Sequence, residues 1–245
     1  MEVNETKEWN KKEWEELIGT LTNISRNTTD IEINNSHIRC WNDLKTTIYD
    51  IKLSKSNFNT IFPLIKYSLP LLKLFTPTED KKVCKTSETD KIFTISDDMS
   101  TLELKKADKQ HCNNPYIADE KFAKIEECLS TTLSTMNIDQ FSLERLKSIA
   151  DNIDISNLLL IVKNKKASLC AKSESSAKSA KIINNIKIDI EDGTYILSYS
   201  LFQYPWEKVV LTIHSEDKED GKYFIKAADS INDQEIIIYG RLLKD

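Results

Sequence analysis

Glycine and proline are scarce in this chain of 245 residues, which has four of the former and five of the latter. So few of either exclude a linker-rich or low-complexity protein, and four scattered glycines cannot build a glycine-rich phosphate loop. Charged residues make up 30% of the chain with the two signs nearly balanced, which excludes a disordered tail. Most of the chain should therefore be packed into one or two soluble domains.

Long apolar runs are also missing. No stretch reaches the roughly 20 apolar residues of a membrane helix, and the longest, residues 61–75, is interrupted by Lys66, Pro70 and Lys73. The charged N-terminal segment lacks the apolar region of a signal peptide, so we expect a cytoplasmic protein. Abundant Ile, Asn and Lys are typical of an AT-rich viral or phage genome, in which case the location would be the host cytoplasm.

Catalytic and metal-binding motifs are absent as well. The five cysteines form no C-x-x-C pair, so we interpret them as free thiols. His37 and His214 fall in strand patterns, and His111 lies in a polar stretch far from both. The acidic residues at 97–98 and 217–220 separate strands, where they usually form turns. We predict no catalytic residue, metal site or cofactor, although an enzyme with a site built from scattered residues stays open.

Apolar periodicity predicts a mixed α+β organisation in the first half of the chain. Residues 9–24 repeat apolar side chains every three or four positions, which is typical of an amphipathic helix. From Asp30 the period changes to two, and the polar residues 34–36 divide a hairpin. A second amphipathic helix is expected over 58–70. Strands are expected at 47–53, 71–75, 91–96 and 101–105.

The same order of elements is expected again in the second half. Ser142 is placed to cap a helix that extends to Ile153, and a short non-strand piece is expected at 201–206. Strands are expected at 158–162, 167–171, 182–190, 195–199, 209–214, 223–228 and 235–240. The repeated order predicts two similar domains, residues 1–108 and 125–245, with a polar connector at 109–124.

Cations lie on the predicted helices, or in one case just after the second helix, away from the apolar stripes. They are Lys11, Lys12, Lys66, Lys73, Arg145 and Lys147. If the helices lie side by side, these residues form a positive surface on a protein of net charge -5, suited to sequence-independent contact with phosphates. No aromatic residues are expected to interleave with them, which argues against a platform for stacking single-stranded bases. The alternative is that they are ordinary solvated helix faces.

The succession of helix, hairpin and meander, present twice, resembles the DNA polymerase sliding clamps. The likeness is strongest to the two-domain processivity factors of tailed phages, relatives of the trimeric PCNA-like rings. Residues 48–50 leading into 58–69, residues 141–162, and residues 204–206 leading into 209–214 look like clamp segments. The resemblance implies a non-enzymatic homotrimeric ring that encircles double-stranded DNA, with two short helices per domain lining the hole and antiparallel sheets outside.

The resemblance also implies partners. A clamp loader would place the ring on DNA, and a replicative DNA polymerase would be tethered through a short apolar peptide bound on the second domain near the connector. Candidates for that pocket, by position alone, are Tyr204, Trp206, Ile236 and Tyr239. The alternative for these four residues is ordinary core burial. The competing function is a non-enzymatic viral interaction or scaffold protein of the same α+β class.

Overall fold

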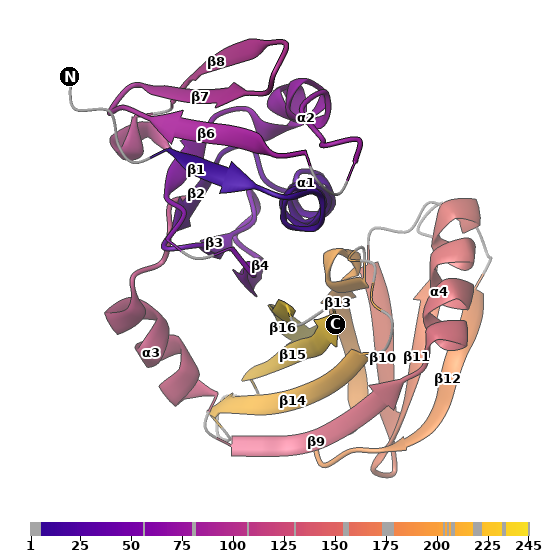
Figure 1. The fold of residues 1–245 in the computed structure, drawn as a ribbon. Coiled ribbons are helices and arrows are strands. Elements are labelled where there is room, and N and C mark those ends of the chain that lie inside the picture. The colour runs from indigo at the N-terminus through magenta and orange to yellow at the C-terminus, as the bar shows by residue number, and fades with distance from the viewer. Residues whose placement is uncertain are drawn as a thin grey trace. The chain divides into compact units, whose positions relative to one another are not determined.

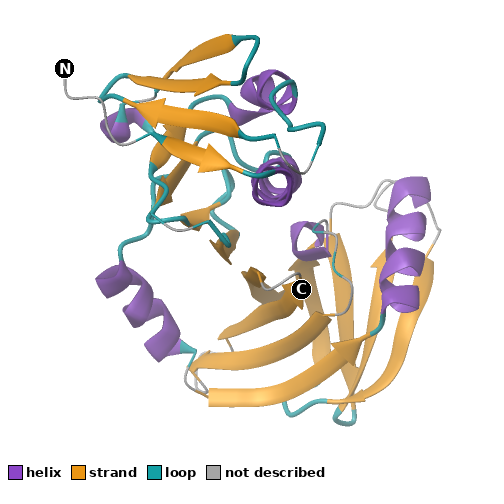
Figure 2. Ribbon diagram, in the orientation of Figure 1, coloured by secondary structure: helices purple, strands orange, loops and turns teal. Residues whose placement is uncertain are grey.

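The structure is a computed structural model. It describes residues 6–55, 57–79, 82–106, 108–129, 131–153, 157–172, 179–202, 204, 206, 209–217, 222–231 and 234–244. The chain divides into two compact units, one of Met1–Leu44 with Asp50–Tyr116 and one of Lys45–Tyr49 with Ile117–Asp245. Both combine helices with antiparallel sheet, as Figure 2 shows, so the predicted α+β class is confirmed.

The first unit contains two helices and two groups of strands (Figure 1). In chain order its elements are β1 (Lys7–Trp9), α1 (Lys11–Ile24), β2 (Ile31–Asn34), β3 (His37–Trp41), β4 (Thr47–Lys52), β5 (Thr60–Phe62), α2 (Ile65–Lys73), β6 (Cys84–Glu88), β7 (Ile92–Ser96) and β8 (Thr101–Lys105). The residues of β4 up to Tyr49 are assigned to the second unit and those from Asp50 to the first. One sheet has the order β1-β6-β7-β8, and the other strands follow the order β4-β3-β2-β5. A short 3-10 helix, Lys109–His111, follows β8.

Local sequence signals explain α1 and the first hairpin. Asn10 caps α1 by accepting a hydrogen bond from the backbone N–H of Glu13, whose carboxylate accepts one from the N–H of Asn10 in return. The predicted apolar stripe of α1 is buried. The turn between β2 and β3 places Asn35 and Ser36 at φ of 47° and 63°, as a two-residue hairpin turn requires. Both predictions are confirmed.

The prediction of a helix over 58–70 and a strand over 71–75 is wrong. Residues 60–62 form β5, which pairs with β2, and the helix is α2, beginning only at Ile65 and running on to Lys73. Leu64, at a left-handed φ of 44°, separates the two elements. Apolar residues at 58, 61, 62 and 65 satisfy either interpretation, so pairing with β2 decided between them. The exposed Pro70 does not end the helix.

The second unit is dominated by one antiparallel sheet. Its elements are α3 (Asp119–Cys128), β9 (Thr131–Ile138), α4 (Gln140–Ile153), β10 (Asn157–Lys163), β11 (Lys166–Lys172), β12 (Ser179–Lys187), β13 (Gly193–Ser198), a 3-10 helix (Tyr199–Phe202), β14 (Val209–Asp217), β15 (Lys222–Ile231) and β16 (Gln234–Lys244). The strands are paired in the order β9-β14-β15-β16-β13-β10-β11-β12. Each strand predicted for this half has a counterpart, although the strand predicted at 182–190 is β12, which ends at Lys187. The helix α4 packs on β11 and β12.

The stretch predicted to be a polar connector is more structured than its composition indicates. Asn114 is fully buried; its side-chain oxygen accepts hydrogen bonds from the N–H groups of Thr29 and Asp30, and its amide donates to the carbonyl of Trp41 at 2.8 Å. Residues up to Tyr116 therefore belong to the first unit. The helix α3, which the sequence did not predict, follows and is held by a buried Phe122.

The N-terminus of α4 is capped by Asp139 rather than by Ser142. The carboxylate of Asp139 accepts hydrogen bonds from the backbone N–H of Ser142 at 2.8 Å and from its hydroxyl at 3.2 Å. The helix begins at Gln140, which puts Asp139 before its first residue and Ser142 in its first turn. The backbone N–H of Ser142 is the main cause that lowers the pKa of Asp139 below its ordinary value of 3.8.

Replacing Asp139 by Ala is expected to lower the thermal midpoint of the protein near neutral pH, because α4 loses its cap. Since the pKa of Asp139 is lowered by folding, its contribution is complete above about pH 4 and disappears as the pH falls through the lower, folded-state pKa. Circular dichroism melts of both proteins across that range should therefore converge at low pH. The control is Ser142→Ala, which keeps the backbone N–H that donates to Asp139. If the thermal midpoints of the unaltered protein and Asp139→Ala still differ by the same amount at low pH, the capping role of Asp139 is contradicted.

Candidate nucleic-acid interface

Two helices of the first unit lie side by side and present four of the predicted DNA-binding cations. The indole nitrogen of the buried Trp14 in α1 donates a hydrogen bond to the carbonyl of Leu72 in α2 at 3.3 Å. With the apolar sides of both helices buried, Lys12, Lys66 and Lys73 are exposed and Lys11 is half-buried. The structure therefore places these four residues on adjacent helices of one unit.

Acidic residues on α1 are engaged by a neighbouring loop. Lys55 forms an ion pair with Glu13 at 3.2 Å, and the carboxylate of Glu16 accepts hydrogen bonds from the backbone N–H and the hydroxyl of Ser54. These contacts hold two of the three acidic side chains of the helix and leave Glu15 exposed. The carboxylates of Glu13 and Glu16 are thus less available to neutralise the positive charges of Lys11 and Lys12.

The exposed side of α2 carries more apolar surface than the positive helix surface predicted from the sequence. Tyr67 and Leu74 are 74% and 75% exposed, and Leu64 and Leu71 are also exposed, so apolar side chains lie along the helix that carries Lys66 and Lys73. An exposed aromatic ring therefore lies beside a lysine, contrary to the expectation that aromatic residues and cations do not interleave. On α2, two point charges are separated by an apolar surface.

The helix α4 of the second unit carries the remaining two predicted DNA-binding cations, neither of which is buried. Leu143 and Leu146 are buried, whereas Arg145 is exposed and Lys147 is half-buried. Phe141, one turn before Arg145, is 73% exposed and is a second aromatic ring beside a predicted DNA contact. The burial of Leu143 and Leu146 confirms these two positions of the predicted apolar stripe, and Ile149 is half-buried. The side chain of Ile153 lies outside the described residues. The DNA-binding role of all six cations stays a prediction.

The four residues predicted for a partner-peptide pocket are buried. Trp206 donates a hydrogen bond to the carbonyl of Leu201 at 2.8 Å and packs against Tyr204, and Tyr239 packs edge-on against Phe122 of α3. Ile236 on β16 is buried as well. These side chains form core contacts, the alternative that the sequence left open, and they do not form an exposed apolar patch. A role of this region in peptide binding stays a prediction.

The described histidines and cysteines considered for catalysis are explained by burial, hydrogen bonds or exposure, without a catalytic role. Burial by itself raises the pKa of Asp50, but hydrogen bonds from His37 at 2.5 Å and Arg39 at 2.8 Å outweigh it and lower that pKa. Burial lowers the pKa of His214, and His111 is exposed. The described cysteine side chains Cys40, Cys84, Cys112 and Cys170 are buried and form no disulfide bond.

Other kinds of site have no candidate within the described part of the chain. No group of three or more His, Cys, Asp or Glu residues there is placed to hold a metal ion. None of the described helices combines the length and the apolar character needed to cross a membrane.

No protein-family model matches the sequence, and no curated protein sequence matches it. The fold, however, matches solved structures of sliding clamps. Proliferating cellular nuclear antigen (PCNA) from Entamoeba histolytica is 8% identical, with 97% of this chain and 98% of that chain covered at a TM-score of 0.62. PCNA of A. fulgidus, bound to the C-terminal region of FEN-1, is 13% identical, with 98% of both chains covered at a TM-score of 0.57.

A longer clamp protein matches in part. A putative DNA polymerase III beta subunit from Eubacterium rectale is 14% identical at a TM-score of 0.63, and the match covers 99% of this chain but only 66% of the beta subunit. The chain therefore spans just under two thirds of that protein and nearly the whole length of the PCNA chains. The fold of this protein is that of the PCNA-like DNA sliding clamps, as the sequence resemblance predicted.

Proposed function

We propose that this protein is a sliding clamp that encircles double-stranded DNA and tethers a replicative DNA polymerase. The observation that carries the proposal is the clamp fold over the whole chain. The outward cations of α1, α2 and α4 support it, because a closed ring needs only weak, interchangeable contacts to phosphates and no contact to base edges. The apolar surface of α2 is compatible with such contacts, since sliding requires that none of them be strong.

An open strand edge in each unit supports ring formation. Among the described residues, β8 pairs only with β7 in the first unit, and β12 pairs only with β11 in the second. Unpaired strand edges are templates for pairing with another chain, and two different edges joined head to tail form a ring when the rotation closes. We propose a homotrimer, in which three chains of two units each form the ring.

The likeness to sliding clamps also supports binding of a partner protein. The A. fulgidus PCNA is bound to a C-terminal peptide region of FEN-1, which supports a polymerase peptide as a ligand here. Loading of the ring would require a separate clamp loader, and the protein itself would perform no catalytic step. A viral or phage replication system is the proposed setting.

Sedimentation velocity over a wide concentration range tests this proposal. Three chains of 28.2 kDa would sediment as a particle of about 85 kDa, in equilibrium with smaller species at low concentration. A processivity assay then follows, in which the protein with a loader should lengthen the products of its polymerase. A monomer at all concentrations, together with unchanged product length in the presence of an active loader, would favour the scaffold alternative.

A further inference from the structure

Three lysines stand directly opposite one another at one end of the sheet of the second unit. Lys163 of β10 is paired in register with Lys166 of β11, which is paired in turn with Lys187 of β12. Directly opposed residues on antiparallel strands project from the same face with Cβ atoms about 4.5–5.5 Å apart. All three side chains are exposed, and no carboxylate within the described part of the chain pairs with any of them. We call these residues the lysine row.

The opposed lysines do not stabilise the folded protein. Like charges that face each other across strands are destabilising, and the turn that joins β10 to β11 is supported by other groups. The carboxylate of Asp192 accepts a hydrogen bond from the N–H of Asn164 at 2.9 Å, and the carbonyl of Lys165 accepts one from Ile188 at 3.1 Å. The turn is thus held in place while the charges of the lysine row are left uncompensated.

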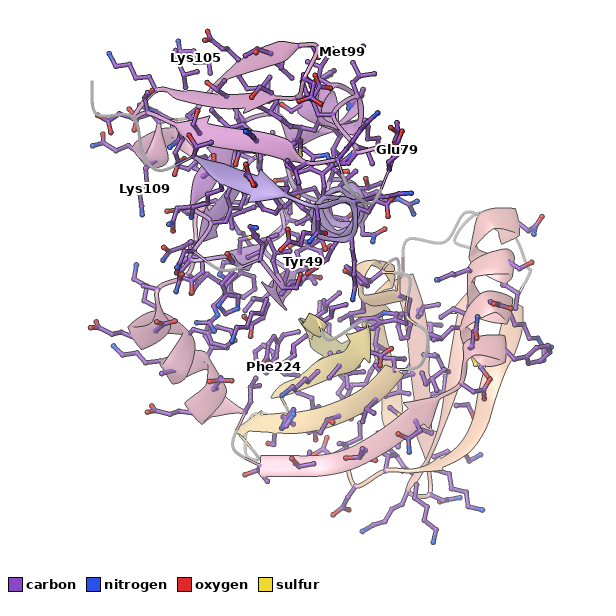
Figure 3. All side chains as sticks on the ribbon, in the orientation of Figure 1. Tyr49, Glu79, Met99, Lys105, Lys109 and Phe224 are labelled. Atoms are coloured by element: carbon purple, nitrogen blue, oxygen red, sulfur yellow. The ribbon has the colours of Figure 1, made fainter. Side chains whose placement is uncertain are left out.

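Acidic side chains around the turn between β10 and β11 have partners outside the lysine row. Asp189 forms an ion pair with Lys165 at 2.9 Å, and Glu191 forms one with Lys244 at 2.8 Å. Asp192 holds the turn. Figure 3 shows nitrogen-tipped side chains that project into solvent from the end of the sheet where β10 joins β11. The lysine row is therefore a positive surface on a protein of net charge -5.

A pocket of about 410 Å³ adjoins the lysine row. Its apolar part comes from Leu133 and the buried Ile188. Its rim includes Lys166 and Lys187 of the row, together with Lys165 and Asp189, whose charges are paired with each other. This combination suits a ligand that carries negative charges and an apolar side chain close together. A nucleic-acid backbone would meet the lysines but leave the apolar part empty, and the described residues that line this pocket include no aromatic ring for base stacking.

We propose that the lysine row and its pocket bind an acidic peptide segment of a partner protein, with carboxylates on the lysines and an apolar side chain in the pocket. All the residues involved lie in the second unit, on β9, β10, β11, β12 and the adjoining turns. None of them is one of the six cations of α1, α2 and α4 that are predicted to contact DNA. The function of this surface therefore does not depend on the encirclement of DNA.

Fluorescence anisotropy with a short labelled peptide of Glu, Asp and Leu tests the proposal on the full chain at low salt. The triple variant K163E/K166E/K187E should bind at least about tenfold more weakly, because three attractive contacts become repulsive. The matched control is K91E/K121E/K124E, which reverses three exposed lysines outside the surface and should bind the peptide as the unaltered chain does. A peptide with Gln and Asn in place of Glu and Asp should bind weakly to every protein.

A single variant separates lost binding from lost folding. Lys166→Glu places a carboxylate between Lys163 and Lys187, so it should raise the thermal midpoint by about 1–3 °C while weakening peptide binding several-fold. A more stable protein that binds less cannot owe its weaker binding to unfolding. The lysine row would then be explained by binding rather than by stability.

Three results would overturn the proposal. They are absence of peptide binding by the unaltered chain at low salt, an equally weakened control triple variant, and equal binding of the uncharged peptide. Duplex DNA is a further competitor to test. If DNA displaces the peptide, and binds more weakly to the lysine-row variant but not to the control variant, this surface is a nucleic-acid contact instead. Because no step involves ring formation, a monomeric chain that still binds the peptide would contradict the proposed clamp function alone.

Discussion

Replacement of both Arg145 and Lys147 by Glu is expected to weaken association with duplex DNA by about 10- to 100-fold at low salt. The change alters the charge of α4 by four units per chain on a helix whose other side is anchored by Leu143 and Leu146. In the proposed ring the change would be repeated in each subunit. Affinity should fall equally for duplexes of unrelated sequence, since contacts to phosphates carry no base information.

Titration of the duplex at several salt concentrations measures this effect. The slope of log affinity against log salt concentration should become shallower by roughly one for each phosphate that the variant protein no longer neutralises. The matched control is Lys121→Glu with Lys124→Glu, two exposed lysines of α3 with the same change in charge. If the affinity of the control falls as far as that of the α4 variant, net charge rather than the helix surface controls binding, and the assignment of α4 to the DNA interface is wrong.

Trp14→Ala is expected to destabilise the first unit by about 3–5 kcal/mol. Trp14 is fully buried in α1, stacks edge-on against Trp9 at 5.4 Å, and donates the hydrogen bond to Leu72 that links α1 to α2. The substitution removes a large apolar side chain and leaves a cavity between the two helices. Because Lys11 and Lys12 are positioned by the same helix, association with DNA should fall as well.

Urea unfolding followed by circular dichroism and tryptophan fluorescence measures the change in stability. The chain has two compact units, so the transition is fitted for the first unit separately rather than as one two-state event. Tyr67→Ala is the control, because this exposed α2 side chain should change stability by no more than about 0.5 kcal/mol. A destabilisation below about 1 kcal/mol for Trp14→Ala would show that the two helices do not depend on this side chain.

Elements with strong local signals were predictable from the sequence. The stripe of α1 follows the helical period, and the hairpins follow residues that accept a left-handed φ, such as Asn35 and Asn164. The exposure of Lys12 and Arg145 could be inferred for the same reason, because their positions fall off the apolar stripes. The clamp fold could be recognised because the order of elements, rather than residue identity, carries the likeness.

Elements with weak or ambiguous local signals were not predictable. The apolar residues around Phe58 and Phe62 fit a helix as well as a strand, and β5 exists because β2 offers an edge to pair with. The helix α3 has charged residues on most positions, and Phe122 alone is buried among its described side chains, which leaves little periodicity to detect. Tyr204 and Trp206 could be exposed or buried on sequence grounds, since aromatic residues occur in both settings.

The sequence by itself determined the α+β class, the main helices and hairpins, and the helix positions from which cations point to solvent. These follow from the periods of 3.6 and 2 and from turn chemistry, which act between residues close in the chain. Only the tertiary structure decided the pairing of β5, the burial of Tyr239 under α3, and the alignment of Lys187 with Lys166 and Lys163. Strand register joins residues distant in sequence, and no local pattern encodes which of them will stand opposite one another.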